Sequence, residues 1–163
     1  MRKFLVVFVC AVGMISCKYG GFKSYETKII SEFSGVWNRF KPLEGTFDIE
    51  NLRKQYEVKV ELSVINGFEY NQIPVEIVIT SPSGQKNIIN KILVIKDKEG
   101  NHIGKAEGDV WTIEQIIYTN KEFTELGKYE VSIQNRTQYY ELFKVKSLSF
   151  TVASLKKKIK KEE

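Results

Sequence analysis

Histidine and cysteine are scarce in this chain of 163 residues, and their scarcity excludes several kinds of chemistry. His102 is the only histidine, and Cys10 and Cys17 are the only cysteines. Zinc sites normally take several His or Cys ligands, so these residues are too few to build one. A serine or cysteine nucleophile would need His102 as its base, and no recognisable nucleophile motif accompanies it. We therefore expect a protein that is not an enzyme, with no catalytic residues, no bound metal and no cofactor.

A net charge is also missing from the body of the chain, although the formal net charge of the whole sequence is +5. Two of the 25 basic residues lie within the first three positions, and five lie in the segment 156–161. Two of the 20 acidic residues end the chain, which leaves 18 basic and 18 acidic residues in the body. Because the body is neutral, the charge does not indicate a nucleic-acid partner. His102 follows the Gly-containing turn 97–101, where we expect it to be exposed.

Long apolar runs are absent apart from one over residues 4–12, which two basic residues precede and the pair Ser16–Cys17 follows. A membrane-spanning helix needs roughly 20 apolar residues, so this run is too short. The arrangement resembles a bacterial lipoprotein signal, in which a small residue precedes a lipidated cysteine. We predict a signal peptide over residues 1–16 and acylation of Cys17, which would anchor the mature chain to a membrane. Because Cys17 would then be the only cysteine, no disulfide could form within a monomer.

The remaining sequence has the period-two alternation of β-strands and no clear amphipathic helix. The clearest strand would bury every second side chain, with Glu61 among the solvent-facing positions, and its buried set is Tyr56, Val58, Val60, Leu62 and Val64. Other predicted strands, joined by Gly, Pro and Asn turns, are 75–79, 88–95, 129–133 and 148–152. Residues 113–125 are ambiguous, because Ile116, Ile117 and Tyr118 are adjacent rather than spaced.

These patterns predict an all-β fold, an antiparallel β-sandwich with a jelly-roll-like arrangement. We assign the lipidated Cys17 and a tether to residues 17–32, the sandwich to residues 33–154 and a basic tail to residues 155–163. The tail follows the last predicted strand, and chain ends of this kind are usually solvated.

Four aromatic residues form the candidate binding surface: Trp37, Trp111, Tyr139 and Tyr140. Large aromatic side chains usually pack in the core, because they carry much of its apolar area. Tyr139 and Tyr140 are neighbours, and neighbouring side chains on a strand point to opposite faces. At least one of the two tyrosines is therefore expected at the surface.

A set of turn and strand motifs, taken in order with the lipoprotein signal, resembles the gliding-motility lipoprotein GldH family. The likeness covers residues 33–152, and its motifs are Trp37, Pro82-Ser83-Gly84, Asp97-Lys98-Glu99-Gly100, Gly108-Asp109-Val110-Trp111 and Gly127-Lys128-Tyr129. The resemblance implies an envelope lipoprotein that contributes to gliding, or to a more general envelope role where gliding does not occur. The family assigns no catalytic residues that could be carried over to this chain.

We therefore expect a lipid-anchored protein that acts as an interaction component of a gliding-motility or related envelope complex, with protein partners. The alternative is a glycan-binding module, which would need Trp37, Trp111 and Tyr140 exposed together. Residues 18–23 contain no acidic residue, and in bacteria of this kind surface lipoproteins carry an acidic run there. This favours attachment to the outer membrane with the domain facing the periplasm.

The anchor should depend on Cys17 alone. In Cys17→Ala no thiol remains at the predicted cleavage site, whereas Cys10→Ala changes only the segment that cleavage removes. Metabolic labelling with a palmitate analogue should mark the wild type and Cys10→Ala but not Cys17→Ala. Label that persists in Cys17→Ala would contradict the lipoprotein assignment.

Overall fold

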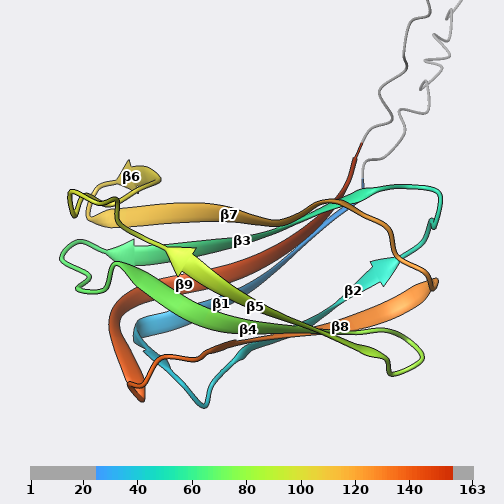
Figure 1. Cartoon of the computed structure of the whole chain (residues 1–163), viewed down its shortest axis with the longest axis horizontal. Coiled ribbons are helices and arrows are strands. Elements are labelled where there is room, and N and C mark those ends of the chain that lie inside the picture. The colour runs from blue at the N-terminus through green and yellow to red at the C-terminus, as the bar shows by residue number, and fades with distance from the viewer. Residues whose placement is uncertain (1–24, 156–163) are drawn as a thin grey trace, which may run out of the picture.

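The computed structural model describes residues 25–155, so the predicted signal peptide, Cys17 and residues 156–163 of the basic tail lie outside the described residues. The described chain forms two antiparallel sheets packed face to face (Figure 1). The strands are β1 (Glu26–Asn38), β2 (Leu43–Ile49), β3 (Tyr56–Ile65), β4 (Gln72–Thr80), β5 (Lys86–Val94), β6 (Lys105–Glu107), β7 (Val110–Lys121), β8 (Gly127–Asn135) and β9 (Glu141–Ser154). Within this part of the chain, no helix has the length and apolar character needed to cross a membrane.

The strand order confirms the predicted sandwich. Sheet A has the order β1-β9-β3-β7-β6, and sheet B has the order β2-β8-β4-β5. When the three-residue β6 is set aside, the other eight strands follow the two four-stranded sheets of a jelly roll. Consecutive strands mostly change sheet, so each sheet is built from segments that are distant in sequence.

The core between the sheets comes from the period-two alternation. All five predicted inward positions of β3, from Tyr56 to Val64, are buried. β9 supplies Leu148, Phe150 and Val152 to the same core. The ring of Phe47 on β2 lies 5.9 Å from that of Phe150, centroid to centroid, which joins the two sheets across the sandwich. Burial of such side chains contributes about 1.5–3 kcal/mol each to folding.

An ion-pair network covers the outer face of sheet A. Glu61 on β3 forms an ion pair with Lys28 on β1, and the Ser149 hydroxyl donates to its carboxylate over 3.2 Å. Lys59 lies 3.7 Å from Glu61 and 2.8 Å from Glu114. Partial burial alone would raise the pKa of Glu61, but the hydrogen bond and charge of Lys28 outweigh it, so that the pKa falls below its ordinary value.

The predicted tether of residues 17–32 was too long. β1 begins at Glu26 and pairs with β9 from Glu26 opposite Ala153 to Asn38 opposite Glu141. The adjacent Ile29 and Ile30 interrupt the alternation that marks a strand, and only one of them faces inward. An edge strand with a half-exposed inner face therefore leaves a weak pattern in the sequence.

The ambiguous segment 113–125 is mostly strand β7. Its register against β3 shifts between the pairs Val58 with Tyr118 and Lys59 with Ile116. A shift of this kind inserts an extra residue into one strand and changes which face the following side chains occupy. The register shift explains why the apolar residues Ile116, Ile117 and Tyr118 are adjacent in the sequence and do not alternate with polar ones.

Replacement of Val60 by Asp should unfold the domain, because it places an unpaired carboxylate among the buried side chains of β3. The cost is several kcal/mol, comparable to the whole stability of a small domain. Glu57→Gln on the outer face of the same strand is the matched control, with an expected change below about 0.5 kcal/mol. Chemical denaturation of both variants measures the difference, and equal destabilisation would contradict the strand assignment.

Glu61 cannot serve as that control, although it faces outward as predicted. Glu61→Lys would remove the carboxylate shared by Lys28 and Lys59 and place a third positive charge between them. The network therefore makes this outward position sensitive to charge reversal.

Candidate functional site

Four aromatic side chains from three connections gather at one end of the sandwich. Phe40 lies in the β1–β2 turn, Tyr70 in the β3–β4 loop, and Tyr139 and Tyr140 in the β8–β9 loop. The rings form two pairs, with centroids 5.7 Å apart for Phe40 and Tyr140 and 5.3 Å apart for Tyr70 and Tyr139. Phe40 is 67% exposed and Tyr140 is 65% exposed. We call this set of four residues the aromatic end.

The aromatic end lies away from both ends of the described chain. In Figure 1 the three connections that carry it are at the left, whereas the chain enters β1 and leaves β9 at the upper right. The entry and exit are tied together there, because Ser154 N donates to Tyr25 O over 2.7 Å. The point where the described chain begins and the aromatic end therefore lie at opposite ends of the strands.

Hydrogen bonds to the backbone support two of the three connections that carry these rings. Arg39 N donates to Tyr140 O over 2.7 Å, and the Gln134 side chain donates to Arg39 O over 3.0 Å. The Thr137 hydroxyl lies 3.1 Å from Tyr139 O. Because the β1–β2 turn and the β8–β9 loop are bonded to each other, the exposed rings sit on a supported backbone rather than on free loops.

A continuous contact also runs from the aromatic end to the core. Phe68 is fully buried, and its ring packs edge to face on Tyr70 with centroids 5.5 Å apart. The turn before it is closed by Lys144, whose ammonium donates to Gly67 O over 3.0 Å. Gly67 has a φ of 77°, a left-handed conformation that other side chains rarely adopt, so the turn favours glycine.

Trp37 was wrongly predicted as part of a binding surface, because its exposed fraction is 0%. Its ring stacks on Phe33 with centroids 5.5 Å apart. Its indole N–H donates to Lys41 O over 3.2 Å. Lys41 follows Phe40 in the β1–β2 turn, so the buried tryptophan supports the turn that presents an exposed ring.

Trp111 is partly buried at the start of β7 and stacks on His102, with centroids 5.3 Å apart and ring planes at 20°. His102 is thus packed rather than exposed, contrary to the prediction from its turn. Its Nε2 atom is buried and has no hydrogen-bond partner among the described residues. Burial, with a smaller contribution from the charge of Lys96, lowers the pKa of His102. The structure therefore gives both residues a packing role and leaves Trp111 outside the two ring pairs.

The structure thus brings Tyr139 and Tyr140 to one surface and adds Phe40 and Tyr70 to them. Tyr70 was missed because aromatic residues are usually assigned to the core. A signal was present, since Tyr70 lies between Asn66-Gly67 and Asn71, and Phe40 lies between Asn38 and Pro42. Aromatic residues inside turn-forming segments tend to be at the surface, because connections run over the surface of a domain.

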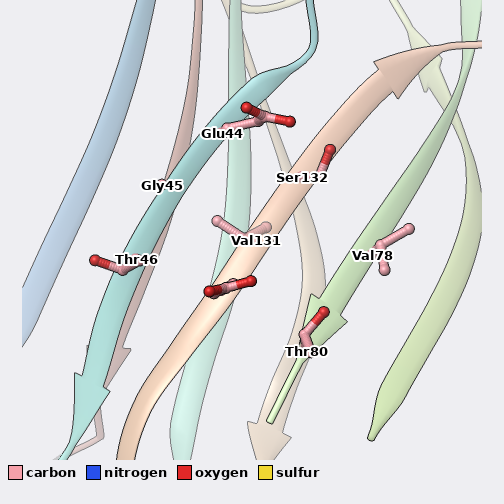
Figure 2. Close-up of a pocket in the computed structure, with 8 residues that line it drawn as sticks. Glu44, Gly45, Thr46, Val78, Thr80, Val131 and Ser132 are labelled. Carbon is pink, nitrogen blue, oxygen red and sulfur yellow. The ribbon is translucent and has the colours of Figure 1, made fainter. Parts of the chain in front are cut away.

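A second feature is an open depression on the outer face of sheet B (Figure 2). It lies over β2, β8 and β4, and Figure 2 shows the oxygen atoms of Glu44, Thr46, Ser132 and Thr80 around it. Val78 forms an apolar border. In residues 25–155, no group of three or more His, Cys, Asp or Glu side chains is arranged to hold a metal ion.

The fold and these surfaces define a small jelly-roll β-sandwich with an exposed aromatic end. The chain belongs to the GldH lipoprotein family, which matches residues 25–152, almost the whole described domain. Membership implies a lipid-anchored protein of the cell envelope. No curated protein matches the chain.

Solved structures share only a distant likeness in fold. A VP2 subviral particle of infectious bursal disease virus is 11% identical over 81% of this chain, with a TM-score of 0.42. Structures of the Gt and Gx strains of that virus are 13% and 12% identical over 80% of this chain, with TM-scores of 0.33 and 0.32. This chain spans 33%, 30% and 31% of the length of those three chains.

The stacked His102 should make stability depend on pH in the range where histidine titrates. Its pKa is lower in the folded protein than the ordinary 6.5, so the unfolded chain binds a proton first as pH falls. The free energy of unfolding should therefore decrease as pH falls below about 6.5, until folded His102 is also protonated.

Denaturant unfolding between about pH 7.5 and pH 5.5 measures this effect, because carboxylates titrate lower. The variant His102→Gln should have a flatter profile than the wild type in that range. The same slope in both proteins would show that His102 does not carry the pH dependence.

Proposed function

We propose that this protein is a non-catalytic, lipid-anchored interaction component of a gliding-motility or related envelope complex, and that it binds a protein partner through the aromatic end. Membership of the GldH lipoprotein family supports the envelope location. The observation that carries the interaction role is the exposure of Phe40, Tyr139 and Tyr140 at one end of the sandwich, on a supported backbone. Protein interfaces are enriched in Tyr, Phe and Trp relative to the rest of the surface.

The physical argument rests on the cost of ordering side chains at an interface. A tyrosine or phenylalanine has few rotatable bonds, so it presents a large contact area at a small loss of conformational entropy. Here the rings of Phe40 and Tyr140 already pack on each other. Hydrogen bonds between their loops hold the backbone in place, which reduces the reorganisation that binding would require.

The orientation of the domain relative to its expected anchor at Cys17 also supports this role. Residues 18–24 join Cys17 to the first described residue, Tyr25, over eight Cα–Cα steps, which span at most about 28 Å. An anchor at Cys17 therefore keeps the Tyr25 end of the sandwich near the membrane and directs the aromatic end away from it. We assign the protein to the outer membrane with its domain in the periplasm, where the aromatic end would reach other envelope proteins.

The alternative, a glycan-binding module, is less well supported. It required Trp37, Trp111 and Tyr140 to be exposed together. Trp37 is fully buried and Trp111 is partly covered by His102, so that row of rings does not form. The exposed rings that remain pack on one another as pairs from different loops, which leaves less free ring face for stacking on sugars.

Replacement of both Phe40 and Tyr140 by Ala in the full-length lipoprotein should abolish partner binding. A photoreactive residue at the exposed position Gln138, in the same loop as Tyr139 and Tyr140, should form adducts in intact cells. The double variant should reduce these adducts at least tenfold, because the removed rings would form the centre of the interface.

Leu126→Ala is the matched control, since Leu126 is an exposed apolar residue in the β7–β8 connection, away from the aromatic end. Adduct yield should be unchanged in this variant, and thermal melting should show that all proteins are folded. Equal adduct yields in the wild type and the Phe40/Tyr140 variant would overturn the proposed function.

A further inference from the structure

β5 is the least protected edge of the sandwich. Four strands lie at sheet edges in the described chain: β1 and β6 in sheet A, and β2 and β5 in sheet B. β1 is irregular, with register shifts around Gly35. β6 has only three residues and leaves most of β7 at the edge, where β7 is irregular because its register against β3 shifts around Val58. β2 is covered by β1, because Asp48 N donates to the Tyr25 hydroxyl and Ile29 packs over Gly45. β5 has nine residues and pairs with β4 without a register shift.

The outer face of β5 is apolar and exposed. Ile88 is 57% exposed and Ile92 is 50% exposed, and Val94 follows at the next alternate position. On β4 their opposite neighbours are Val78 beside Ile88 and Pro74 beside Ile92. Natural edge strands are usually protected by proline, bulges or charges, because unpaired strands with apolar faces recruit other chains. β5 has no proline and no bulge, and neither of its lysines lies between Ile88 and Ile92 on the outer face, since Lys86 precedes them and Lys91 is on the alternate face.

The unpaired backbone N–H and C=O groups of β5 belong to the strand positions on this same outer face, Ile88, Asn90 and Ile92. Ile92 lies opposite Pro74, which has no N–H, and Pro74 O instead accepts from Arg136 N over 2.8 Å. Val94 O points away from β4, since it accepts from the Gln115 side chain over 2.9 Å. Backbone groups alternate in direction along a strand, so the N–H and C=O of Ile88, Asn90 and Ile92 face the open edge.

We propose that β5 accepts an additional antiparallel strand from a partner protein, along Lys86–Ile92. The strand would carry aliphatic side chains opposite Ile88 and Ile92, and acidic side chains opposite Lys86 and Lys91. The charge of β5 supports this choice, because it contains two lysines and no acidic residue. Main-chain hydrogen bonds would supply affinity, and the alternating side chains would supply specificity, as in other cases of strand addition.

A second copy of this chain fits the edge less well. Antiparallel pairing of β5 with itself would bring four lysines into one two-stranded ribbon with no acidic residue. In such a dimer the two copies would run in opposite directions, so the Tyr25 end of one copy would lie at the opposite end of the joined sheet from the Tyr25 end of the other. The site is separate from the aromatic end and does not depend on the function proposed for it.

A designed peptide tests this site on the full-length lipoprotein in detergent. The probe is an extended peptide with valine opposite Ile88 and Ile92, glutamate opposite Lys86 and Lys91, and threonine elsewhere. Saturable slowing of amide hydrogen exchange at Ile88, Asn90 and Ile92 is expected, because these N–H groups would become hydrogen-bonded. A peptide with lysine in place of glutamate should bind at least tenfold more weakly.

Two variants separate edge pairing from other binding. Asn90→Pro should retain the fold but lose the slowing, because proline removes an N–H that faces the open edge rather than β4. The double variant Lys86→Glu/Lys91→Glu should reverse the order of peptide affinities, so that the lysine peptide binds more tightly than the glutamate peptide. No slowing at the highest soluble peptide concentration, equal slowing by both peptides, or a β5-dependent homodimer in sedimentation would each overturn the proposal.

Discussion

The packing of β9 against both of its neighbours is the constraint on which the rest of the structure depends. β9 lies between β1 and β3, and its register with both is continuous from Ser147 to Ala153. Phe150 faces the core, while Ser149 and Thr151 are buried on the opposite face beneath longer side chains. Both neighbours of β9, β1 and β3, are distant from it in sequence. Its non-local pairings predict slow folding for a domain of this size.

The sequence signal was clearest in the strand whose inward side chains are all buried and apolar. The alternation of β3 was clear because every inward side chain is buried, and the predicted strands at β4, β5, β8 and β9 follow from the same pattern. β1 was missed because an edge strand needs only a partly apolar inner face. β2 was also missed, although it buries Leu43, Phe47 and Ile49, because Gly45 interrupts the apolar alternation between them. The site could be predicted only in part. Adjacent tyrosines at positions 139 and 140 indicated exposure, but their pairing with Phe40 and Tyr70 arises from the meeting of three connections, which no local pattern contains.

Buried and exposed aromatic residues have complementary roles in this domain. Trp37 holds the β1–β2 turn from below through its bond to Lys41 O, and Phe68 supports Tyr70 from the core. The exposed rings are therefore continuous with the packed interior. The lipid anchor, expected from the signal sequence and the family, would fix the direction in which the aromatic end points.

The most direct test of this account compares solvent accessibility in the cell with that of the purified protein. Hydroxyl-radical footprinting can measure the oxidation rates of Phe40, Tyr139 and Tyr140 in intact envelopes and in detergent. The account predicts strong protection of these three rings in envelopes and no protection of the exposed Leu126 near the other end. Equal oxidation of the aromatic end in both preparations would contradict its role as an interface.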